Sequence, residues 1–477
     1  FTVAGVGDMS GDVFGNGMLL SKAIRLVAAF DHRDIFIDPS PDLAKSFAER
    51  QRLFALPRSS WADYDASLIS EGGGVFSRAA KSIPLSPQVQ ALIGLTQAKA
   101  TPAEVMHAIL KMKVDLLWFG GIGTYIRAPA ETDAEVGDRA NDAIRVVASE
   151  LQAKVIGEGA NLGLTQRARI AFARRGGRCN SDAIDNSAGV NSSDVEVNIK
   201  IAFRNAMETT GLTRPSRDQL LAAMTDEVAG LVLANNYRQT LAISLVEQRG
   251  LEDFGYQRRL MRQLEASGEL NRAVEALPND AELANREKAG EGLSRPEIGV
   301  LLAYAKLALK AKLLASPVPD DTALDAMLMH YFPSAMRGDY AASIESHRLK
   351  REIIATVLTN AMIDAGGPTL PTRIADRTGA DAAESARAFV AANAVFGLDA
   401  LTRQIDALDA KVPGALQMEL YGEVQSLLID GLIWMVRQAT TGAGARVTID
   451  RFKPAHDNLA GHVAAFVPDR LADAART

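Results

Sequence analysis

The chain has 477 residues, of which 47% are hydrophobic and 23% are charged, and its net charge is −6. At about 100–200 residues per domain, this length predicts two to four domains, and the composition excludes a disordered or collagen-like chain. The small net charge indicates neither a nucleic acid nor a membrane as a partner. The single cysteine, Cys179, excludes internal disulfides and indicates a reducing, cytoplasmic location. No metal site is expected.

Residues 1–200 alternate short apolar runs with helical stretches. The apolar runs are Phe1–Val6, Arg25–Ile37, Val114–Phe119, Lys154–Ile156 and the weaker Arg178–Asn180, and we expect the strands within them. Most of these runs are followed by turns rich in Gly, Asn or Asp. Such repetition of strand, turn and helix is typical of an α/β domain, with a parallel sheet and helices on both faces.

From about residue 201 the strand pattern fades and helix signals replace it. Ser216 with Gln219 and Ser294 with Glu297 fit the capping-box pattern at the start of a helix. Apolar residues between 416 and 435 recur at helical spacing. We therefore expect residues 201–477 to form a mostly α-helical domain of one or two subdomains.

The glycine-rich start of the chain resembles a phosphate-binding turn. The first strand runs into Gly5-Val6-Gly7, and we expect a helix after it that carries Gly17, Leu20 and Ile24 on one face. A dinucleotide-binding unit needs this order of strand, turn and helix. We expect a second strand at Arg25–Phe30 that ends at Asp31, about 20 residues further on, where an acid would accept hydrogen bonds from the adenosine ribose. A carboxylate there favours NAD over NADP, but the nearby Arg33 leaves NADP open.

Two features depart from this fingerprint. The third glycine is displaced to Gly11, and Asp8 places a carboxylate beside the expected phosphate. The alternative is a glycine-rich turn that binds nothing. Gly15 and Gly17 favour cofactor binding, because a glycine inside a helix costs about 1 kcal/mol relative to alanine and such a cost suggests a close backbone approach. We therefore predict a Rossmann-like, mostly parallel NAD-binding domain over residues 1–200.

Three later segments carry motifs that resemble a known family. They are Phe119-Gly120-Gly121-Ile122-Gly123-Thr124-Tyr125, Glu158-Gly159-Ala160-Asn161, and the stretch from Asp182 to Asp194 with the pattern D-x-x-x-N-S-A-G-V-x-x-S. In these segments and in the opening turn, the chain resembles the large NAD-specific glutamate dehydrogenases of bacteria. The motifs cover about residues 1–200, and the remainder resembles the helical C-terminal extension of that group.

The resemblance implies a role for each matching position. The implied cofactor contacts are Gly5, Gly7, Asp8, Met9 and Ser10 at the pyrophosphate, Asp31 at the adenosine ribose, Gly120 and Gly121 beneath the cofactor, Asn161 at the nicotinamide ribose, and Asn186 at the carboxamide. Val190 and Ser193 would face the amino-acid substrate, with Ser193 donating a hydrogen bond to a γ-carboxylate. That contact would separate glutamate from leucine or phenylalanine.

The family converts L-glutamate to 2-oxoglutarate and ammonia, with NAD as the hydride acceptor. Its catalytic lysine and aspartate lie in a substrate domain upstream of the cofactor domain in the same chain. Because Phe1 already falls in the first expected strand, we assign no catalytic residue and expect this chain alone to bind NAD without turning over glutamate. We also expect a homo-oligomer. Two alternatives remain open, a dehydrogenase for another amino acid and a non-catalytic NAD-sensing or assembly module.

Overall fold

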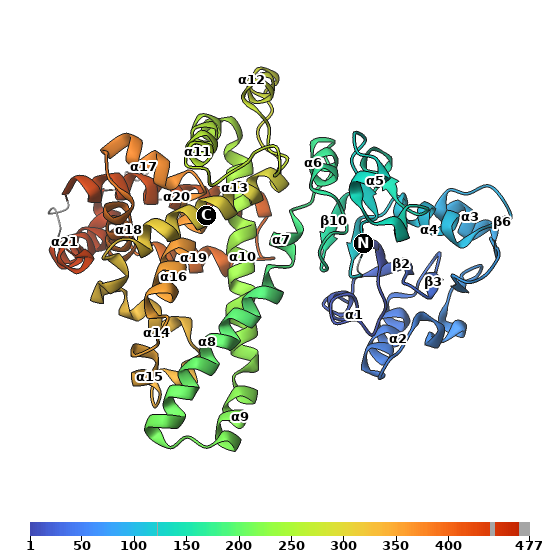
Figure 1. Ribbon diagram of the computed structural model, residues 1–477, viewed down its shortest axis with the longest axis horizontal. Helices are drawn as coiled ribbons and strands as arrows, with labels where there is room; N and C mark the ends of the chain where they lie inside the picture. Colours follow the sequence, from blue (N-terminus) through green and yellow to red (C-terminus); the bar gives the residue numbers. More distant parts are fainter. Residues whose placement is uncertain (122, 439–443, 467–477) are drawn as a thin grey trace. The chain divides into compact units, whose positions relative to one another are not determined.

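The computed structural model describes residues 1–121, 123–438 and 444–466 (Figure 1). The chain divides into two compact units. The first comprises Phe1–Val190, Val274–Leu277 and Ser294–Val300, and the second comprises the remaining residues. The division at Val190 lies within helix α8 (Ser187–Thr210), as does the boundary at residue 200 that the sequence suggested. That boundary stays a prediction.

The first unit contains the sheet. Its strands are β1 (Thr2–Val6), β2 (Arg25–Phe30), β3 (Asp34–Ile37), β4 (Gly74–Ser77), β5 (Ile83–Pro84), β6 (Lys99–Ala100), β7 (Leu116–Phe119), β8 (Ile126–Arg127), β9 (Val146–Val147) and β10 (Val155–Glu158). Its helices are α1 (Phe14–Leu19), α2 (Leu43–Ala55), α3 (Pro87–Ile93), α4 (Pro102–Leu110), α5 (Asp133–Val136), α6 (Gln166–Arg174) and α7 (Asp182–Asp185).

The main sheet has the strand order β10-β7-β1-β2-β3-β4. The strands β10, β7, β1 and β2 are parallel, whereas β3 and β4 are antiparallel additions at one edge. This arrangement confirms the predicted mostly parallel α/β class. The sequence missed β4, because three consecutive glycines, the last of which begins this strand, suggest a loop.

The apolar run Arg25–Ile37 contains two strands, because the chain reverses in its middle. The second strand that the sequence predicts, Arg25–Phe30, is confirmed as β2. The carboxylate oxygen Oδ1 of Asp31 accepts hydrogen bonds from the backbone N–H groups of Arg33 (2.7 Å) and Asp34 (2.8 Å). Asp side chains stabilise tight turns in this way, and the result is the β2–β3 hairpin. In the apolar run Arg178–Asn180, Arg178 forms only an isolated bridge with Val155.

Both faces of the sheet are buried. Alternate residues of β1 point to opposite sides, so Val3 packs in the core under α1 and α2, whereas Ala4 and Val6 pack in the core with α4 and α6. A parallel sheet covered on both faces needs apolar residues on both, which explains the unbroken apolar strand runs in the sequence.

Helix α1 is much shorter than the sequence suggested. It ends at Leu19, and Leu20, which was expected on its apolar face, is 85% exposed. Two glycines within six residues weaken the helix, and the backbone N–H of Leu20 bonds Gly17 in a tight final turn. Residues 8–13 therefore form a loop rather than the first turns of a helix.

The side chain of Phe14 fills the space over the ends of β1 and β7. A Cβ atom added to Gly5, Gly7 or Gly120 would lie 2.5, 2.9 or 2.4 Å from atoms of Phe14. Gly7 also has a φ of +136°, which other residues rarely adopt. These three glycines are thus required by the packing of one buried ring.

The second unit is helical. Its main helices are α8, α9 (Arg214–Ala223), α10 (Thr225–Arg249), α11 (Phe254–Ala266), α12 (Asp280–Ala289), α13 (Arg295–Leu314), α14 (Asp325–Tyr331), α15 (Ala341–Glu345), α16 (Lys350–Gly366), α17 (Leu370–Thr378), α18 (Ala382–Phe396), α19 (Leu398–Asp406), α20 (Gly414–Gln438) and α21 (Ala445–Phe466). The expected helical class of residues 201–477 is thus confirmed for the described part.

Of the two capping boxes, one forms. Both the backbone N–H and the hydroxyl of Ser294 donate to Glu297 at 2.7 Å. Ser216 is not a cap, because Thr213 occupies that position at the start of α9.

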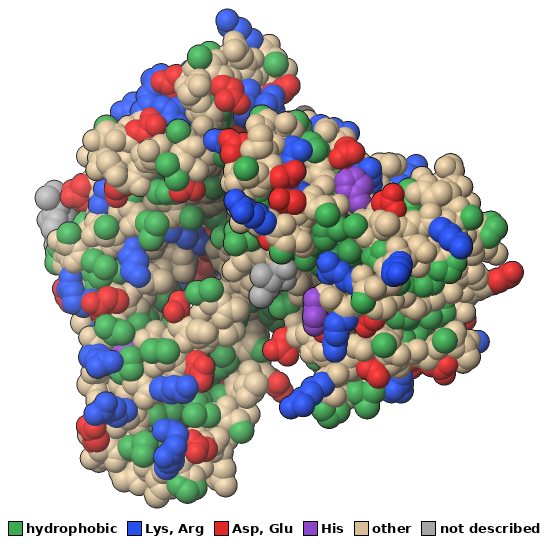
Figure 2. Space-filling view, turned by 45° about the vertical axis from the view of Figure 1, so that its right-hand side comes forward, with side chains coloured by type: hydrophobic (Ala, Val, Ile, Leu, Met, Phe, Trp, Pro, Cys, Tyr) green, Lys and Arg blue, Asp and Glu red, His purple; other side chains and the backbone are tan. Residues whose placement is uncertain are grey.

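Buried charges pair inside the helical unit. Lys306 of α13 contacts Asp364 of α16 at 2.7 Å, and Arg373 pairs with Asp253. Burial raises the pKa of Asp364, with the ammonium of Lys306 opposing that shift. On the face shown in Figure 2, acidic and basic side chains are interspersed. Within the described ranges, no helix is both long enough and apolar enough to cross a membrane.

We predict that Gly120→Ala lowers the free energy of unfolding by about 1–3 kcal/mol, because the new methyl group must displace Phe14. Thermal and urea denaturation would measure the change. Gly121→Ala is the matched control, since a Cβ there meets Val6 at an ordinary 3.5 Å. Equal losses of stability in the two variants would contradict the role assigned to Phe14.

Candidate functional site at the carboxyl edge

The strand order reverses beside β1. The chain passes from β1 to β2 on one side and later returns to β7 on the other side. In open α/β sheets, ligands bind at the carboxyl ends of the strands where such a reversal occurs. The turn after β7 starts next to the end of β1, because the N–H of Gly120 donates to the carbonyl of Val6 at 2.7 Å. The glycine-rich turns at Gly7 and at Gly120-Gly121 therefore lie together.

The loop after β1 is fixed by side chains. The carbonyl of Gly7 accepts a 2.9 Å hydrogen bond from the indole of Trp61. Met9 is fully buried, and the hydroxyl of Ser10 donates to Asp8 at 2.9 Å. The carboxylate of Asp8 also faces the guanidinium of Arg33 at 3.6 Å. Asp8 is therefore an internally compensated group rather than an isolated negative charge.

Asp31 lies at the end of β2 and is 7% exposed. Its Oδ1 holds the hairpin, while its Oδ2 is buried with no hydrogen-bond partner among the described residues. An unpartnered buried carboxylate oxygen is costly and calls for an explanation, and a donor from a ligand would supply one. The adenosine ribose has two hydroxyl donors, and this residue therefore fits the cofactor that the sequence suggested.

The glycines themselves give weaker support than the sequence suggested. A Cβ on Gly15 would lie 2.3 Å from the carbonyl of Met9, and one on Gly17 would lie 3.0 Å from the ring of Trp118. Close packing inside the domain thus accounts for both glycines without a ligand. The fit to a dinucleotide rests on Asp31 and on the strand order instead.

A buried arginine joins the two later motifs. Arg169 of α6 makes two hydrogen bonds to the carboxylate of Glu158 (2.6 and 2.9 Å) and an ion pair with Asp182 (3.0 Å). Glu158 ends β10 and Asp182 begins α7. Burial raises the pKa of Glu158, and the guanidinium of Arg169 opposes that shift only in part. This arrangement ties together segments that are 24 residues apart in the sequence.

Further hydrogen bonds fix the same two segments. Asp182 accepts from the N–H of Leu162 at 3.0 Å, and Asp185 accepts from the N–H of Glu158 at 3.1 Å. Asp185 also accepts from the amide of Asn180 at 2.8 Å, and Asn180 in turn accepts from Arg295 at 3.0 Å. Burial raises the pKa of Asp185, with the Asn180 hydrogen bond opposing that shift.

These supports bring the two motif asparagines into contact. The amide nitrogen of Asn186 donates to the side-chain oxygen of Asn161 at 3.2 Å. Asn161 is exposed and Asn186 is partly exposed, so both amides can reach a ligand. The structure thus pairs two predicted site residues that are 25 positions apart.

Val190 and Ser193 both lie on helix α8, and both side chains are exposed. They are three residues apart, so they lie on the same side of the helix. The structure therefore places both side chains on one side of the same helix.

The sequence did not single out Arg169 or Trp61. Helix α6 and the residue after it contain four arginines, and nothing in the spacing shows which one is buried. Trp61 reaches Gly7 across 54 residues, which no local pattern could reveal.

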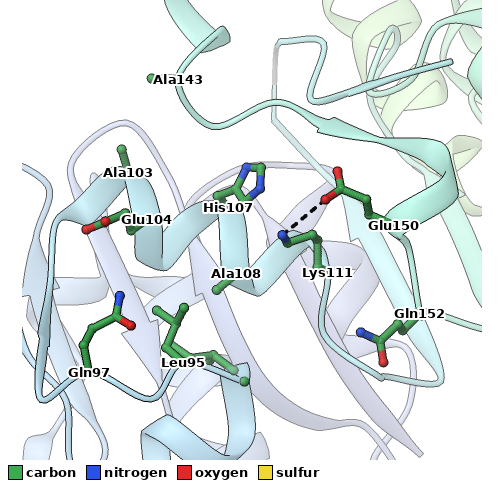
Figure 3. A pocket seen from close by; sticks show the side chains of 12 residues that line it. Leu95, Gln97, Ala103, Glu104, His107, Ala108, Lys111, Ala143, Glu150 and Gln152 are labelled. Carbon is green, nitrogen blue, oxygen red and sulfur yellow. Dashed lines mark hydrogen bonds and ion pairs between the residues drawn. The ribbon is translucent and has the colours of Figure 1, made fainter. Parts of the chain in front are cut away.

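A separate hollow of about 670 Å³ is lined by residues of α3, α4 and the segment around Gln152 (Figure 3). Lys111 and Glu150 form an ion pair of 3.4 Å across it, and His107 lies beside them (Figure 3). None of its lining residues belongs to the motif turns. It is thus distinct from the site at the carboxyl edge.

The strand order and the reversal beside β1 define a doubly wound α/β domain, the class whose carboxyl edge binds nucleotides. The chain belongs to the bacterial NAD-glutamate dehydrogenase family, whose catalytic-domain model matches residues 1–246. A second model, described as the C-terminal domain of glutamate dehydrogenase, matches residues 290–477. The resemblance suggested by the motifs is therefore confirmed.

Curated relatives are similar over almost the whole chain. NAD-specific glutamate dehydrogenases of Halomonas elongata, Pseudomonas aeruginosa and Mycobacterium tuberculosis are 51%, 49% and 48% identical to it over 454, 453 and 458 residues. Each alignment covers 95% of this chain but 28% of the relative. The chain thus spans less than a third of the length of these relatives.

We predict that Arg169→Gln lowers the free energy of unfolding of the first unit by about 3–5 kcal/mol, because it leaves the buried Glu158 uncompensated. The loss would appear in thermal denaturation. Arg167→Gln is the matched control on the same helix, since Arg167 is exposed and its removal should change stability by no more than about 0.5 kcal/mol. Similar effects of the two substitutions would refute the bridging role of Arg169.

Proposed function

We propose that this chain is the NAD-binding part of a glutamate dehydrogenase, which converts L-glutamate to 2-oxoglutarate and ammonia. The observation that carries this proposal is the unpartnered Oδ2 of Asp31 at the carboxyl edge, next to the reversal of strand order. Membership of the family and the names of the similar proteins support the proposed activity.

In this proposal, the residues at the carboxyl edge of the sheet contact different parts of NAD. Asp31 accepts hydrogen bonds from the adenosine ribose. The backbone of Gly5 and Gly7 and of the three residues after them, Asp8, Met9 and Ser10, lies along the pyrophosphate, and Gly120 and Gly121 lie beneath the cofactor. Asn161 and Asn186 hold the nicotinamide end. NAD, when bound, supplies the acceptor for the hydride that leaves the α-carbon of the amino acid.

The contact between Asn161 and Asn186 supports the assignment at the nicotinamide end. The Oδ1 of Asn161 accepts from Asn186, which fixes the orientation of both amides. One N–H of Asn186 and the amide group of Asn161 then remain for polar groups of a ligand. Amides fixed in this way would orient the nicotinamide, because hydride transfer requires the α-carbon and the cofactor to be held close together.

Val190 and Ser193 are proposed to face the substrate. The hydroxyl of Ser193 would donate to the γ-carboxylate of glutamate, and Val190 would contact its carbon chain. Both side chains are exposed on one side of α8, as such contacts require.

The turns at the carboxyl edge contain no lysine in residues 7–13, 31–34, 120–125 and 158–164. Hydrolysis of an imine needs a general base to activate water and a cationic group to stabilise the developing charge. These groups would come from the substrate domain that the relatives' greater length can accommodate. We therefore propose that the 477-residue chain binds NAD without turning over glutamate.

Thermal denaturation with increasing NAD tests this proposal. We expect NAD to raise the melting temperature of the chain in a saturable way, since a ligand that binds only the folded state stabilises it. Asp31→Asn keeps an oxygen for the hairpin and removes the negative charge, so it should weaken NAD binding about tenfold or more. In parallel, no NADH should form from glutamate and NAD. A chain that NAD does not stabilise, or one that oxidises glutamate at an enzymatic rate, would contradict the proposal.

The role of Ser193 is testable in the full-length protein. Ser193→Ala should reduce kcat/KM for glutamate about tenfold or more and leave slow reactions of apolar amino acids unchanged, because only glutamate has the γ-carboxylate. Ser192→Ala, one position earlier on the same helix, is the control. An unchanged preference for glutamate would argue against the contact.

A further inference from the structure

The ion pair between Asp8 and Arg33 joins the two turns that would surround the adenosine half of the cofactor. Asp8 follows β1, and Arg33 lies in the β2–β3 hairpin. The guanidinium of Arg33 is 3.6 Å from Oδ2 of Asp8, and Oδ1 of Asp8 accepts from Ser10 at 2.9 Å. A carboxylate beside an expected phosphate is unfavourable on its own, so its position needs another reason.

Arg33 is the cation that a 2′-phosphate would need. Its backbone N–H donates to Oδ1 of Asp31, so the residue starts beside the group proposed to contact the adenosine ribose. Its side chain is 46% exposed, which leaves it accessible to a ligand. Arginine binds phosphate oxygens with two parallel N–H donors. Without a competing anion, Arg33 could therefore bind the phosphate that distinguishes NADP from NAD.

A second arginine nearby is already occupied. The guanidinium of Arg78 donates to the backbone carbonyl of Asp31 at 2.6 Å, and its backbone N–H donates to the carbonyl of Arg33 at 2.8 Å. Arg78 thus supports the hairpin, and Arg33 is the side chain whose direction depends on Asp8.

We propose that Asp8 determines the cofactor specificity of this chain by holding Arg33 away from the ribose 2′ position and neutralising its charge. The proposal rests on the function proposed above and adds to it a residue that rejects NADP. With the charge of Arg33 compensated by Asp8, the carboxylate of Asp31 at the ribose repels a 2′-phosphate. Repulsive groups placed against a competing ligand are a general source of specificity.

The test measures binding of NAD and NADP separately, by thermal shift and by calorimetry, on the complete 477-residue chain. Asp8→Asn keeps the size of the side chain and an acceptor for Ser10, and it should raise the affinity for NADP relative to NAD about tenfold. Because the ion pair is partly exposed, its loss should leave the fold intact.

Two further variants isolate the cause. Adding Arg33→Gln to Asp8→Asn should abolish the gain for NADP, because the released guanidinium is then absent. Asp12→Asn removes a negative charge from the same loop without touching the ion pair with Arg33, and it should leave the ratio of affinities within about twofold.

The outcomes separate the two proposals. An unchanged affinity ratio in Asp8→Asn, with normal NAD binding, would overturn the role of Asp8 and leave the proposed function intact. An equal gain in relative NADP affinity in Asp12→Asn would also overturn the role of Asp8, since the net charge of the loop would then be the cause. If neither nucleotide stabilises the unaltered chain, the proposed function and the role of Asp8 both fall.

Discussion

The buried guanidinium of Arg169 is the interaction on which the candidate site depends. It compensates Glu158 at the end of β10 and Asp182 at the start of α7, and these two carboxylates would otherwise be buried or partly buried without a counter-charge. Because the two segments are fixed, Asn161 and Asn186 meet. The acidic residues of both motifs therefore have a structural role, and the asparagines beside them remain available for a ligand.

The packing of Phe14 is a second constraint, and it acts at the carboxyl ends of β1 and β7. Phe14 occupies the space that Gly5, Gly7 and Gly120 leave free, so the pattern of glycines reflects the packing of one ring. In the loop that follows β1, Asp8 pairs with Arg33 at 3.6 Å. A glycine-rich turn is thus poor evidence of a bound phosphate until the neighbouring side chains are known. The unpartnered oxygen of Asp31 is better evidence, because no hydrogen bond within the described residues satisfies it.

The helical unit is constrained by buried ion pairs. It buries charged side chains in pairs, as Lys306 with Asp364 and Arg373 with Asp253. Such pairs add little to stability, but removing one partner costs much more, so they favour one particular packing of helices. Not all apolar residues of α20 are buried. Leu428 and Met435 are buried, whereas Leu416 and Leu427 are exposed. Periodicity predicted this helix but could not show which apolar side the unit would bury.

The sequence by itself determined the mostly parallel α/β class, the helical class of the later residues, the family, and the turns that carry the motifs, because these depend on local periodicity and on short residue patterns. It could not determine the hairpin at Asp31, the short α1, the absence of a cap at Ser216 or the choice of Arg169 among neighbouring arginines. Those features arise from contacts between residues far apart in the chain, and only the tertiary structure shows which of several chemically similar side chains is desolvated and therefore must find a partner.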